Sequence, residues 1–193
     1  MPHRLTTRRV ALSQATRRVA FLRAVNVGGH TIRMADLHAS FEALGFGAVE
    51  TFIASGNVIF ESPEADEEKL QRLIERGLEA DYGYPIESFI RSLGELAVIA
   101  ASDPFERQDP ANDGRSVFVA FLGRPPTPEA VARLITLATD DDSFAVVGRE
   151  AYWLRRGGIG TSRFSSGFLE KTLGMPATLR GLPTVAKIVT RYR

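Results

Sequence analysis

Two hydrophobic periods alternate along residues 19–91 and predict the order strand, helix, strand, strand. Val19–Val25 is an apolar run with one charge, and apolar residues at helical spacing follow it and end at Gly45. Two further apolar segments, Val49–Ala54 and Val58–Glu61, flank the turn-forming residues Ser55-Gly56-Asn57. This arrangement predicts a hairpin directly after the first helix.

A second helix and a last strand complete this half of the chain. We expect the helix to begin after Ser62 as its N-cap, with Pro63 in the first turn, and to end at Gly83. Ile86–Arg91 is the last expected strand. The order βαββαβ predicts a ferredoxin-like unit over residues 19–91, in which both helices cover one face of an antiparallel sheet.

Residues 92–193 begin the same order again. A helix is expected from the capping box Ser92–Glu95, followed by a strand, a helix capped by Thr127, and a hairpin around residues 148–150. Further helices are expected over residues 163–173 and 184–191, so that a helix takes the place of the last strand. Residues 103–114 are the expected linker. We therefore predict an α+β protein of two tandem ferredoxin-like units, βαββαβ and βαββα, with antiparallel sheets.

The composition is that of a globular protein and excludes some chemistry. The 193 residues are 44% apolar and 24% charged, which is enough to bury a core without disulfides or a structural metal. There is no cysteine, which excludes thiolate zinc clusters and cysteine nucleophiles. No apolar run is long enough to span a bilayer and no signal peptide is evident, so a cytoplasmic protein without a membrane partner is expected.

The net charge of +1 hides a strong polarity along the chain. Residues 1–18 carry five arginines and no acid, residues 61–114 carry 14 acids against 5 bases, and residues 149–193 carry 9 bases against 2 acids. The first of these segments has no apolar period and predicts a disordered basic extension, with contact to polyanions as the alternative. The acidic middle would repel nucleic acid, so any phosphate-binding surface must be local.

The first candidate site lies where the first strand meets the first helix. Gly28 and Gly29 stand in that connection, where glycines let backbone N–H groups approach an anion. Arg23 shares strand parity with Phe21, and an arginine on an apolar strand face needs a buried or ligand-borne acceptor. A tight connection for the glycines and a salt bridge for Arg23 are the structural alternatives.

A second glycine-rich loop, residues 157–162, precedes another helix, with Arg163 and Lys171 on roughly one helical face. Such a loop could cradle a phosphate, although a solvated connection is the alternative. The chain has no established nucleophile or metal motif. The acidic run 140–142 predicts a solvated loop, and strand alternation predicts that one of Tyr152 and Trp153 faces solvent.

Several segments together resemble a bacterial family known as domain of unknown function 1697. They are FLRAVNVGG, MADLHASFEALGF, TFIASGNVIFES, VVGREAYW and GTSRFSSGFLEKTLGMPATLRGLPTVAKI, and the resemblance covers residues 19–189. It implies a compact α+β protein of two ferredoxin-like units, and it implies no established activity or cofactor.

The resemblance also implies a polar motif in this chain. Its positions are Arg23, Asn26, Gly28, Gly29, Ser55, Gly56 and Asn57, joined by Arg163, Leu169 and Lys171. The chain departs from the family pattern at Ala24, His30, Ala54 and Gly181-Leu182, where glycine, lysine, glutamine and an Asn-Trp pair are usual. If the usual side chains touch a ligand, this chain binds a different ligand or none.

Two function classes follow from these observations. The first is a small-molecule or anion-binding protein, with or without catalysis, in which Arg23 and Arg163 hold an anionic group and Asn26, Ser55 and Asn57 orient it. The second is a nucleic-acid-binding module, because ferredoxin-like sheets often carry RNA and the C-terminal segment is basic. The predicted strands carry no aromatic pair of the RNA-binding type, which favours the first class. The cofactor and the oligomeric state stay unknown at this level.

Overall fold

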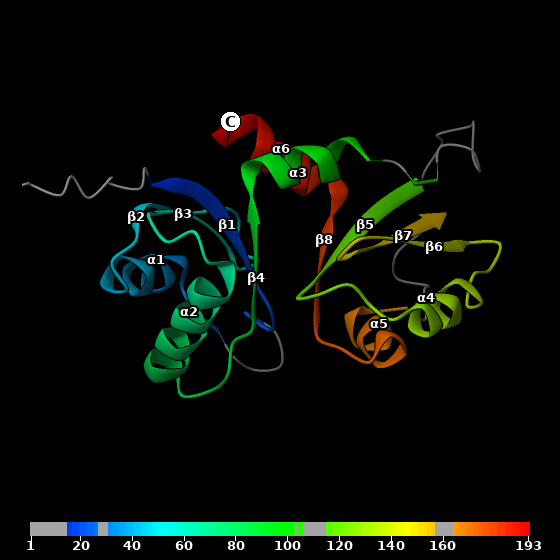
Figure 1. Ribbon diagram of the computed structural model, residues 1–193, viewed down its shortest axis with the longest axis horizontal. Helices are drawn as coiled ribbons and strands as arrows, with labels where there is room; N and C mark the ends of the chain where they lie inside the picture. Colours follow the sequence, from blue (N-terminus) through cyan, green and yellow to red (C-terminus); the bar gives the residue numbers. More distant parts are fainter. Residues whose placement is uncertain (1–14, 27–30, 103, 106–114, 157–163) are drawn as a thin grey trace, which may run out of the picture.

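The computed structural model describes residues 15–26, 31–102, 104–105, 115–156 and 164–193, which form two units side by side (Figure 1). The first unit contains β1 (Thr16–Leu22), α1 (Met34–Ala43), β2 (Gly47–Thr51), β3 (Asn57–Ser62), α2 (Glu67–Tyr82) and β4 (Ser88–Ser92). The remaining elements are α3 (Leu93–Ala101), β5 (Arg115–Leu122), α4 (Pro128–Ile135), β6 (Asp142–Val147), β7 (Glu150–Arg156), α5 (Ser166–Leu173), β8 (Ala177–Gly181) and α6 (Leu182–Tyr192). The first six elements follow the predicted order.

Each unit is built on one four-stranded sheet. The strand order is β2-β3-β1-β4 in the first sheet and β6-β7-β5-β8 in the second, and all neighbouring strands are antiparallel. The central strands β1 and β5 contain the same four residues, Val-Ala-Phe-Leu, at 19–22 and 119–122. The structure confirms an α+β protein with two antiparallel sheets, and the six helices of its described part are consistent with two similar units.

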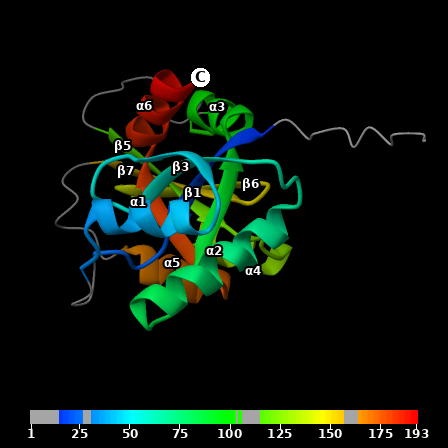
Figure 2. The same ribbon diagram turned by 90° about the vertical axis from the view of Figure 1, so that its left-hand side faces the viewer.

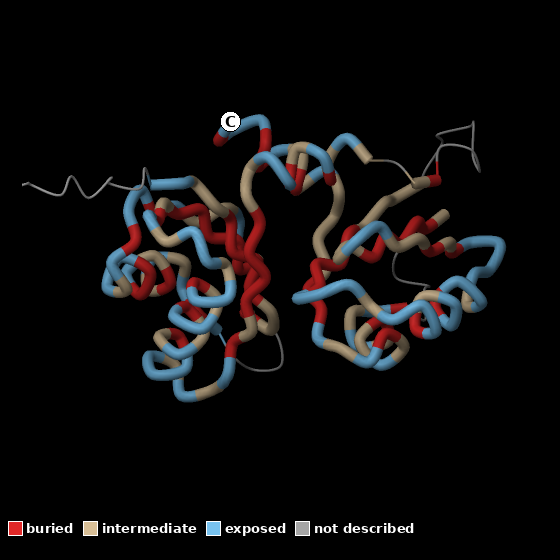
Figure 3. Tube along the Cα trace, viewed as in Figure 1, coloured by how far each residue is buried: buried red, intermediate tan, exposed pale blue. Residues whose placement is uncertain are grey.

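Alternation along the two central strands divides the interior into three cores. Leu22 packs beneath α1 and α2, and Leu122 packs beneath α4 and α5. Phe21 and Phe121 point the other way, toward the opposite sheet, and their rings stack with centroids 4.0 Å apart. Buried residues are therefore concentrated along the strands at the centre of the molecule (Figure 3).

α3 and α6 lie together over one end of the space between the sheets (Figures 1 and 2). The buried residues Ile99 and Ile188 join the core that the two sheets share. α3 begins at the expected capping box, in which Ser92 Oγ accepts from the Glu95 backbone and Glu95 Oε2 accepts from the Ser92 N–H at 2.8 Å. Within the described ranges, none of the helices has the length and hydropathy needed to cross a bilayer.

The start of β1 and the start of α2 differ from the prediction. β1 begins at Thr16, so residues 16–18 pair with neighbouring strands instead of belonging to a disordered extension. Ser62 is the buried last residue of β3, and the N-cap of α2 is Asp66, whose carboxylate accepts from the Lys69 N–H. Because β3 extends as far as Ser62, this residue belongs to the sheet and cannot cap α2. Asp66, the next suitable polar residue before α2, caps the helix instead.

The second unit has the last strand that the sequence pattern did not predict. β8 pairs with the central strand β5, and α6 follows it directly with Pro183 in its first turn. β8 has only five residues, too few for a clear strand period. The expectation of a helix in place of this strand was therefore wrong, and the second unit also contains βαββαβ.

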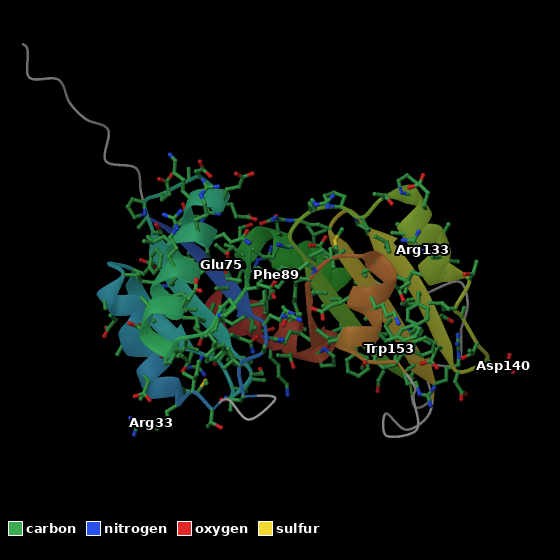
Figure 4. The ribbon with its side chains drawn as sticks, turned by 90° about the horizontal axis from the view of Figure 1, so that it is seen from below. Arg33, Glu75, Phe89, Arg133, Asp140 and Trp153 are labelled. Carbon is green, nitrogen blue, oxygen red and sulfur yellow. The ribbon has the colours of Figure 1, made fainter. Side chains whose placement is uncertain are left out.

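Two expectations about β6 and β7 were also wrong. Asp142 is buried, and its carboxylate accepts hydrogen bonds from Trp153 Nε1 and Arg155 Nη1, each at 2.7 Å. Tyr152 and Trp153 are both buried, because the sheet is covered on both faces. Figure 4 shows Trp153 within the second unit and Asp140 at its outer edge, so only the start of the acidic run is solvated.

Candidate functional site

A cavity of about 540 Å³ lies between the two units, at the C-terminal end of β1. Its walls are the residues after β1, the link between β2 and β3, the first turn of α5, and β8. The volume falls in the range of about 300–1,000 Å³ that is typical of small-molecule pockets. Arg23 from the first unit and Arg180 from the second are the two basic side chains among the described residues of this wall.

Arg180 crosses from β8 into the first unit. Its Nε donates to Asn57 Oδ1 at 2.6 Å, and its Nη2 donates to the carbonyl oxygens of Leu22 at 3.0 Å and Ser55 at 2.6 Å. Its Nη1 donates to two acceptors on β8 itself. All five N–H groups thus have neutral acceptors, and none of the described carboxylates pairs with this guanidinium.

Arg91 takes the corresponding place in the first sheet. Arg91 is opposite Val19 on β1, as Arg180 is opposite Val119 on β5. Arg91 crosses into the second unit, where its Nη2 donates to the carbonyl of Leu122 at 2.9 Å. Each guanidinium also lies over the phenylalanine of the opposite unit, at 5.4 Å for Arg91 and 5.7 Å for Arg180. The two units therefore exchange one arginine each.

The partner of Nε distinguishes the two arginines. The Nε of Arg91 donates to Glu150 Oε1 at 2.7 Å, an ion pair that is almost fully buried. Asn57 and Glu150 face the corresponding phenylalanines of β1 and β5 in the two registers. A neutral amide thus stands beside Arg180 where a carboxylate stands beside Arg91.

Burial changes the acidity of both arginines. It lowers the pKa of Arg180 to about 10, so the group is protonated at neutral pH but is solvated less well than in water. The pKa of Arg91 is also lowered, by burial and by the charge of Arg149, while Glu150 acts in the opposite direction. Arg180 has no such carboxylate, so its buried charge is not compensated by any described residue.

Arg23 is held by carboxylates from both units. Its Nε and Nη2 donate to Glu170 of α5 at 2.5 and 3.0 Å, and its Nη1 donates to Glu87 at 2.7 Å. These contacts, with the hydrogen bond to Glu170 the largest cause, raise the pKa of Arg23. The salt bridge that the sequence left open is therefore present. Three of the five N–H groups of Arg23 are used in these contacts, and the other two have no partner among the described residues.

The first turn of α5 forms another wall. α5 has 8 residues and α2 has 16, and each ends at a glycine with positive φ, Gly174 and Gly83. When the two helices are aligned at these glycines, α5 begins at the position of the middle of α2. The N-terminus of α5 lies at the cavity, where Ser166 and Gly167 are lining residues. Ser165 caps this end, and the N–H groups of Ser166 and Gly167 have no acceptor within the helix. Free amides at the positive end of a helix dipole favour an anion.

The backbone around the cavity is strained. Ala24 (φ 59°), Asn26 (φ 62°) and Ile53 (φ 52°) have left-handed φ although none is glycine. Ala24 and Asn26 line the cavity, and Ile53 directly precedes the lining residue Ala54. Such residues cost about 1–3 kcal/mol each, and they cluster at ligand sites. Three of the four described non-glycine residues with positive φ therefore lie at or beside the cavity, and the fourth, Ala48, lies on β2.

The structure brings together part of the predicted site. Arg23, Asn26 and Ser55 line the cavity, and Asn26 is oriented by a backbone N–H that donates to its Oδ1 at 2.8 Å. Asn57 is fully buried and positions Arg180, so it does not face the cavity. The lining residues come from two loops of the first unit, between β1 and α1 and between β2 and β3, as the sequence suggested.

Gly56 supports the wall without facing the cavity. Its φ is 70°, and a Cβ at this position would lie 3.2 Å from the Cβ atoms of Leu22 and Val25. Its carbonyl accepts from the Leu22 N–H at 2.8 Å. Glycine therefore lets the hairpin approach the end of β1.

Other predicted site residues do not add to this cavity as described. Gly28, Gly29 and Arg163 lie outside the described residues, and so does the rest of the glycine-rich loop 157–163. Lys171 is exposed on α5 and is not part of the cavity wall. Arg23 does lie beside α5, where the site was predicted, and its contact with this helix is an ion pair with Glu170.

Sequence reasoning missed Arg180, Glu170 and Thr178. Arg180 and Thr178 belong to β8, a strand that was not predicted, so nothing placed them beside β1. The repeated order of elements was a signal that could have found them. A second βαββα segment predicts one more strand by analogy with the first unit, and residues 177–181 form that strand.

Several basic side chains of the C-terminal segment are neutralised within the protein. The ion pairs are Arg149 with Glu67 and Glu95, Arg155 with Asp142, and Arg191 with Glu50. These pairs leave less cationic surface for a polyanion than the sequence suggested. Among the described residues, no group of three acidic or histidine side chains is placed to hold a metal ion.

Comparisons with known proteins agree with the fold. The profile of a family described as "Protein of unknown function (DUF1697)" matches residues 15–152. The solved structure of the conserved bacterial protein SP0830 from Streptococcus pneumoniae is similar, with a TM-score of 0.71 and 22% sequence identity over 92% of this chain and 98% of that chain. A similarity at this identity shows the fold alone. No curated protein matches the sequence.

Proposed function

The chain belongs to the family of proteins of unknown function DUF1697, and we propose from the chemistry of the cavity that it binds a small anionic molecule there. The observation that carries the proposal is the neutral surroundings of Arg180. The arginine in the corresponding place, Arg91, has a carboxylate partner in Glu150. An anion in the cavity would supply the charge that Asn57 does not.

The residues of the cavity wall also have donors without an acceptor among the described residues, and these donors would bind such an anion directly. They are the two unused N–H groups of Arg23 and the backbone amides of Ser166 and Gly167. Arg180 contributes through its charge, because its own N–H groups are occupied. Fixed donors around a buried charge are the usual means by which proteins bind carboxylates and phosphates.

Strain at Ala24, Asn26 and Ile53 supports the same location. No observation on the described surface favours nucleic acid in the same way, because the proposed anion-binding groups line a cavity between the units and the basic residues Arg149 and Arg155 of the C-terminal segment are paired. A small molecule therefore fits the arrangement better than a polymer.

We also infer that the units before and after residue 92 are two domains of the ferredoxin-like type. The support is the same βαββαβ order and the same order of strands in both sheets. A cytoplasmic location remains part of this proposal.

The experiment is a thermal-shift screen of small carboxylates, phosphates and sulfonates against the wild-type protein. A ligand that binds the folded state raises the melting temperature with its concentration. The main variant is Ser166→Asp, which places a carboxylate in the first turn of α5, where helices accept acids well. We expect this variant to fold and to lose the ligand-induced shift.

Two matched variants interpret the result. Ser166→Asn introduces a side chain of nearly the same size as Ser166→Asp but without the charge, and this variant is expected to retain binding. Glu150→Gln removes the carboxylate beside Arg91, away from the cavity, and is expected to lower the melting temperature while keeping the ligand-induced increase. The proposal fails if no anion stabilises the wild-type protein, or if Ser166→Asp binds the same anion unchanged.

A further inference from the structure

Among the described residues, the charges around the cavity are balanced but separated in space. Arg180 and Arg23 supply two positive charges, and Glu170 and Glu87 supply two negative charges. The two carboxylates share one arginine, Arg23, whereas Arg180 has none. The cavity therefore has a positive side at β8 and a side with one excess negative charge at α5 and Glu87.

A simple anion would be attracted to only the positive side of the cavity. Bound near Arg180 it would also lie in the field of Glu170, a carboxylate of the cavity wall whose side chain is only 17% exposed. The anion and the Glu170 carboxylate would repel each other appreciably, because both would be largely shielded from water. A ligand that also carries a positive group would turn that repulsion into attraction.

We propose that the ligand is a zwitterion of the amino-acid type. Its anionic group would bind the unused N–H groups of Arg23 and the α5 amides, near the charge of Arg180, and its ammonium group would bind Glu170. This inference rests on the proposed function and narrows its ligand class. The groups that would hold such a molecule are already oriented by the fold.

Glu170 has room for an ammonium donor. Its Oε1 accepts from Arg23 Nε and from the Ala177 N–H, whereas its Oε2 accepts only from Arg23 Nη2 among the described donors. A carboxylate oxygen has two acceptor sites, so Oε2 has one left. Glu87 also accepts a hydrogen bond from Arg23. This contact would hold Arg23 in place when Glu170 accepts a hydrogen bond from the ligand.

The unused N–H groups of Arg23 lie on the same guanidinium that binds Glu170. An α-amino acid carries its carboxylate and its ammonium on one carbon, so both can be reached by Arg23 and Glu170 together. The remaining volume of the cavity is available to the side chain of the ligand. Binding of this kind leaves neither charged group of the ligand buried without a partner.

The test compares three forms of the same molecule on the wild-type protein. Each proteinogenic L-amino acid that produces a thermal shift is measured by calorimetry against its N-acetyl form and its des-amino carboxylate. Both derivatives keep the carboxylate and lack the ammonium. We expect at least one amino acid to bind about tenfold or more tightly than either derivative, because a charge-assisted hydrogen bond is lost.

A variant locates the ammonium site. Glu170→Gln is expected to abolish the preference for the amino acid while binding of the des-amino carboxylate is retained or improved. Glu79→Gln, a change of an exposed glutamate on α2, is expected to leave the preference intact. If Glu170→Gln does not fold, the comparison of the three forms on the wild-type protein still decides.

Equal or tighter binding of the des-amino carboxylate to the wild-type protein overturns the zwitterion and leaves the anion site standing. Binding of neither form, with no other anion active, overturns both proposals. A preference that Glu170→Gln leaves unchanged in a folded variant also overturns the assignment of the ammonium site.

Discussion

Arg180 Nε lies 2.6 Å from Asn57 Oδ1, a neutral acceptor at the place where the corresponding arginine, Arg91, meets the carboxylate of Glu150 at 2.7 Å. Both arginines cross between the units, so both help to hold the two sheets together. Only one of them has its charge compensated within the described protein. The two contacts thus distinguish an arginine whose charge is paired from one whose charge is not, and this difference is the basis of the proposed anion site.

Replacing Glu150 with Gln should strongly destabilise the protein. The change leaves the charge of Arg91, whose side chain is 1% exposed, without a partner. Removal of one member of a buried pair costs about 3 kcal/mol or more. Chemical denaturation measures this loss. Glu61→Gln, which breaks a half-exposed pair with Arg17, is the control and should cost less than about 1 kcal/mol. Equal effects of the two changes would show that Arg91 does not depend on its ion pair.

Gly56→Ala should be more destabilising than Gly45→Ala. Both glycines have positive φ, 70° and 86°, so both alanine variants carry a conformational cost of about 1 kcal/mol. At Gly56 the new methyl group also lies 3.2 Å from Leu22 and Val25, whereas nothing lies within 4 Å at Gly45. Such contacts add about 1–3 kcal/mol. The difference in free energy of unfolding between the variants isolates the contact, and no difference would mean that the hairpin can move away.

The order of elements could be predicted because most of it depends on local pattern. The hairpin around Gly56, the glycine end of α2 and the capping box at Ser92 are set by neighbouring residues, and the structure confirms them. The strand β8 could not be predicted in this way. Its five residues become a strand by pairing with β5, a contact between distant parts of the chain.

In the candidate site, too, some residues could be predicted from local sequence pattern and others could not. Arg23 was predicted from strand parity, and the structure shows that this parity directs it toward the second unit and Glu170. The role of Asn57 depends on Arg180, which is 123 residues away in the sequence. No local pattern relates these two residues, and the packing of the units brings them together.

Ser92→Ala should destabilise the protein by about 1 kcal/mol, because the change removes the side-chain half of the capping box of α3. Thr190→Ala is a suitable control. Thr190 is exposed in α6, where its hydroxyl only donates to the carbonyl of Ala186, and its replacement should change stability by less than about 0.5 kcal/mol. Denaturant midpoints of the two variants give the comparison. A loss at Thr190 as large as the loss at Ser92 would contradict the role of the cap.

Glu95→Gln should reduce stability at neutral pH but not in acid. Burial acts to raise the pKa of Glu95, but hydrogen bonds from Ser92 and Arg149 outweigh it and lower the pKa below the ordinary value of 4.5. A carboxyl group with a lowered pKa in the folded state stabilises the protein above its unfolded value, and the contribution is lost as the pH falls through the folded pKa. The melting temperatures of wild type and variant should therefore converge from pH 6 toward pH 3. A constant difference would show that the charge of Glu95 does not contribute.

The anion site itself is most directly tested by NMR of arginine side chains during titration with the best small anion or amino acid from the screen. The account predicts saturable shifts of the Nε–H signals of Arg180 and Arg23 and of the Ser166 and Gly167 amides, all with one dissociation constant, while the Nε–H signal of Arg91 stays in place. Arg91 is an internal control, because it crosses between the units in the corresponding way but pairs with Glu150 and does not line the cavity. Equal shifts of Arg91 and Arg180, or no saturable shift at Arg180, would contradict the account.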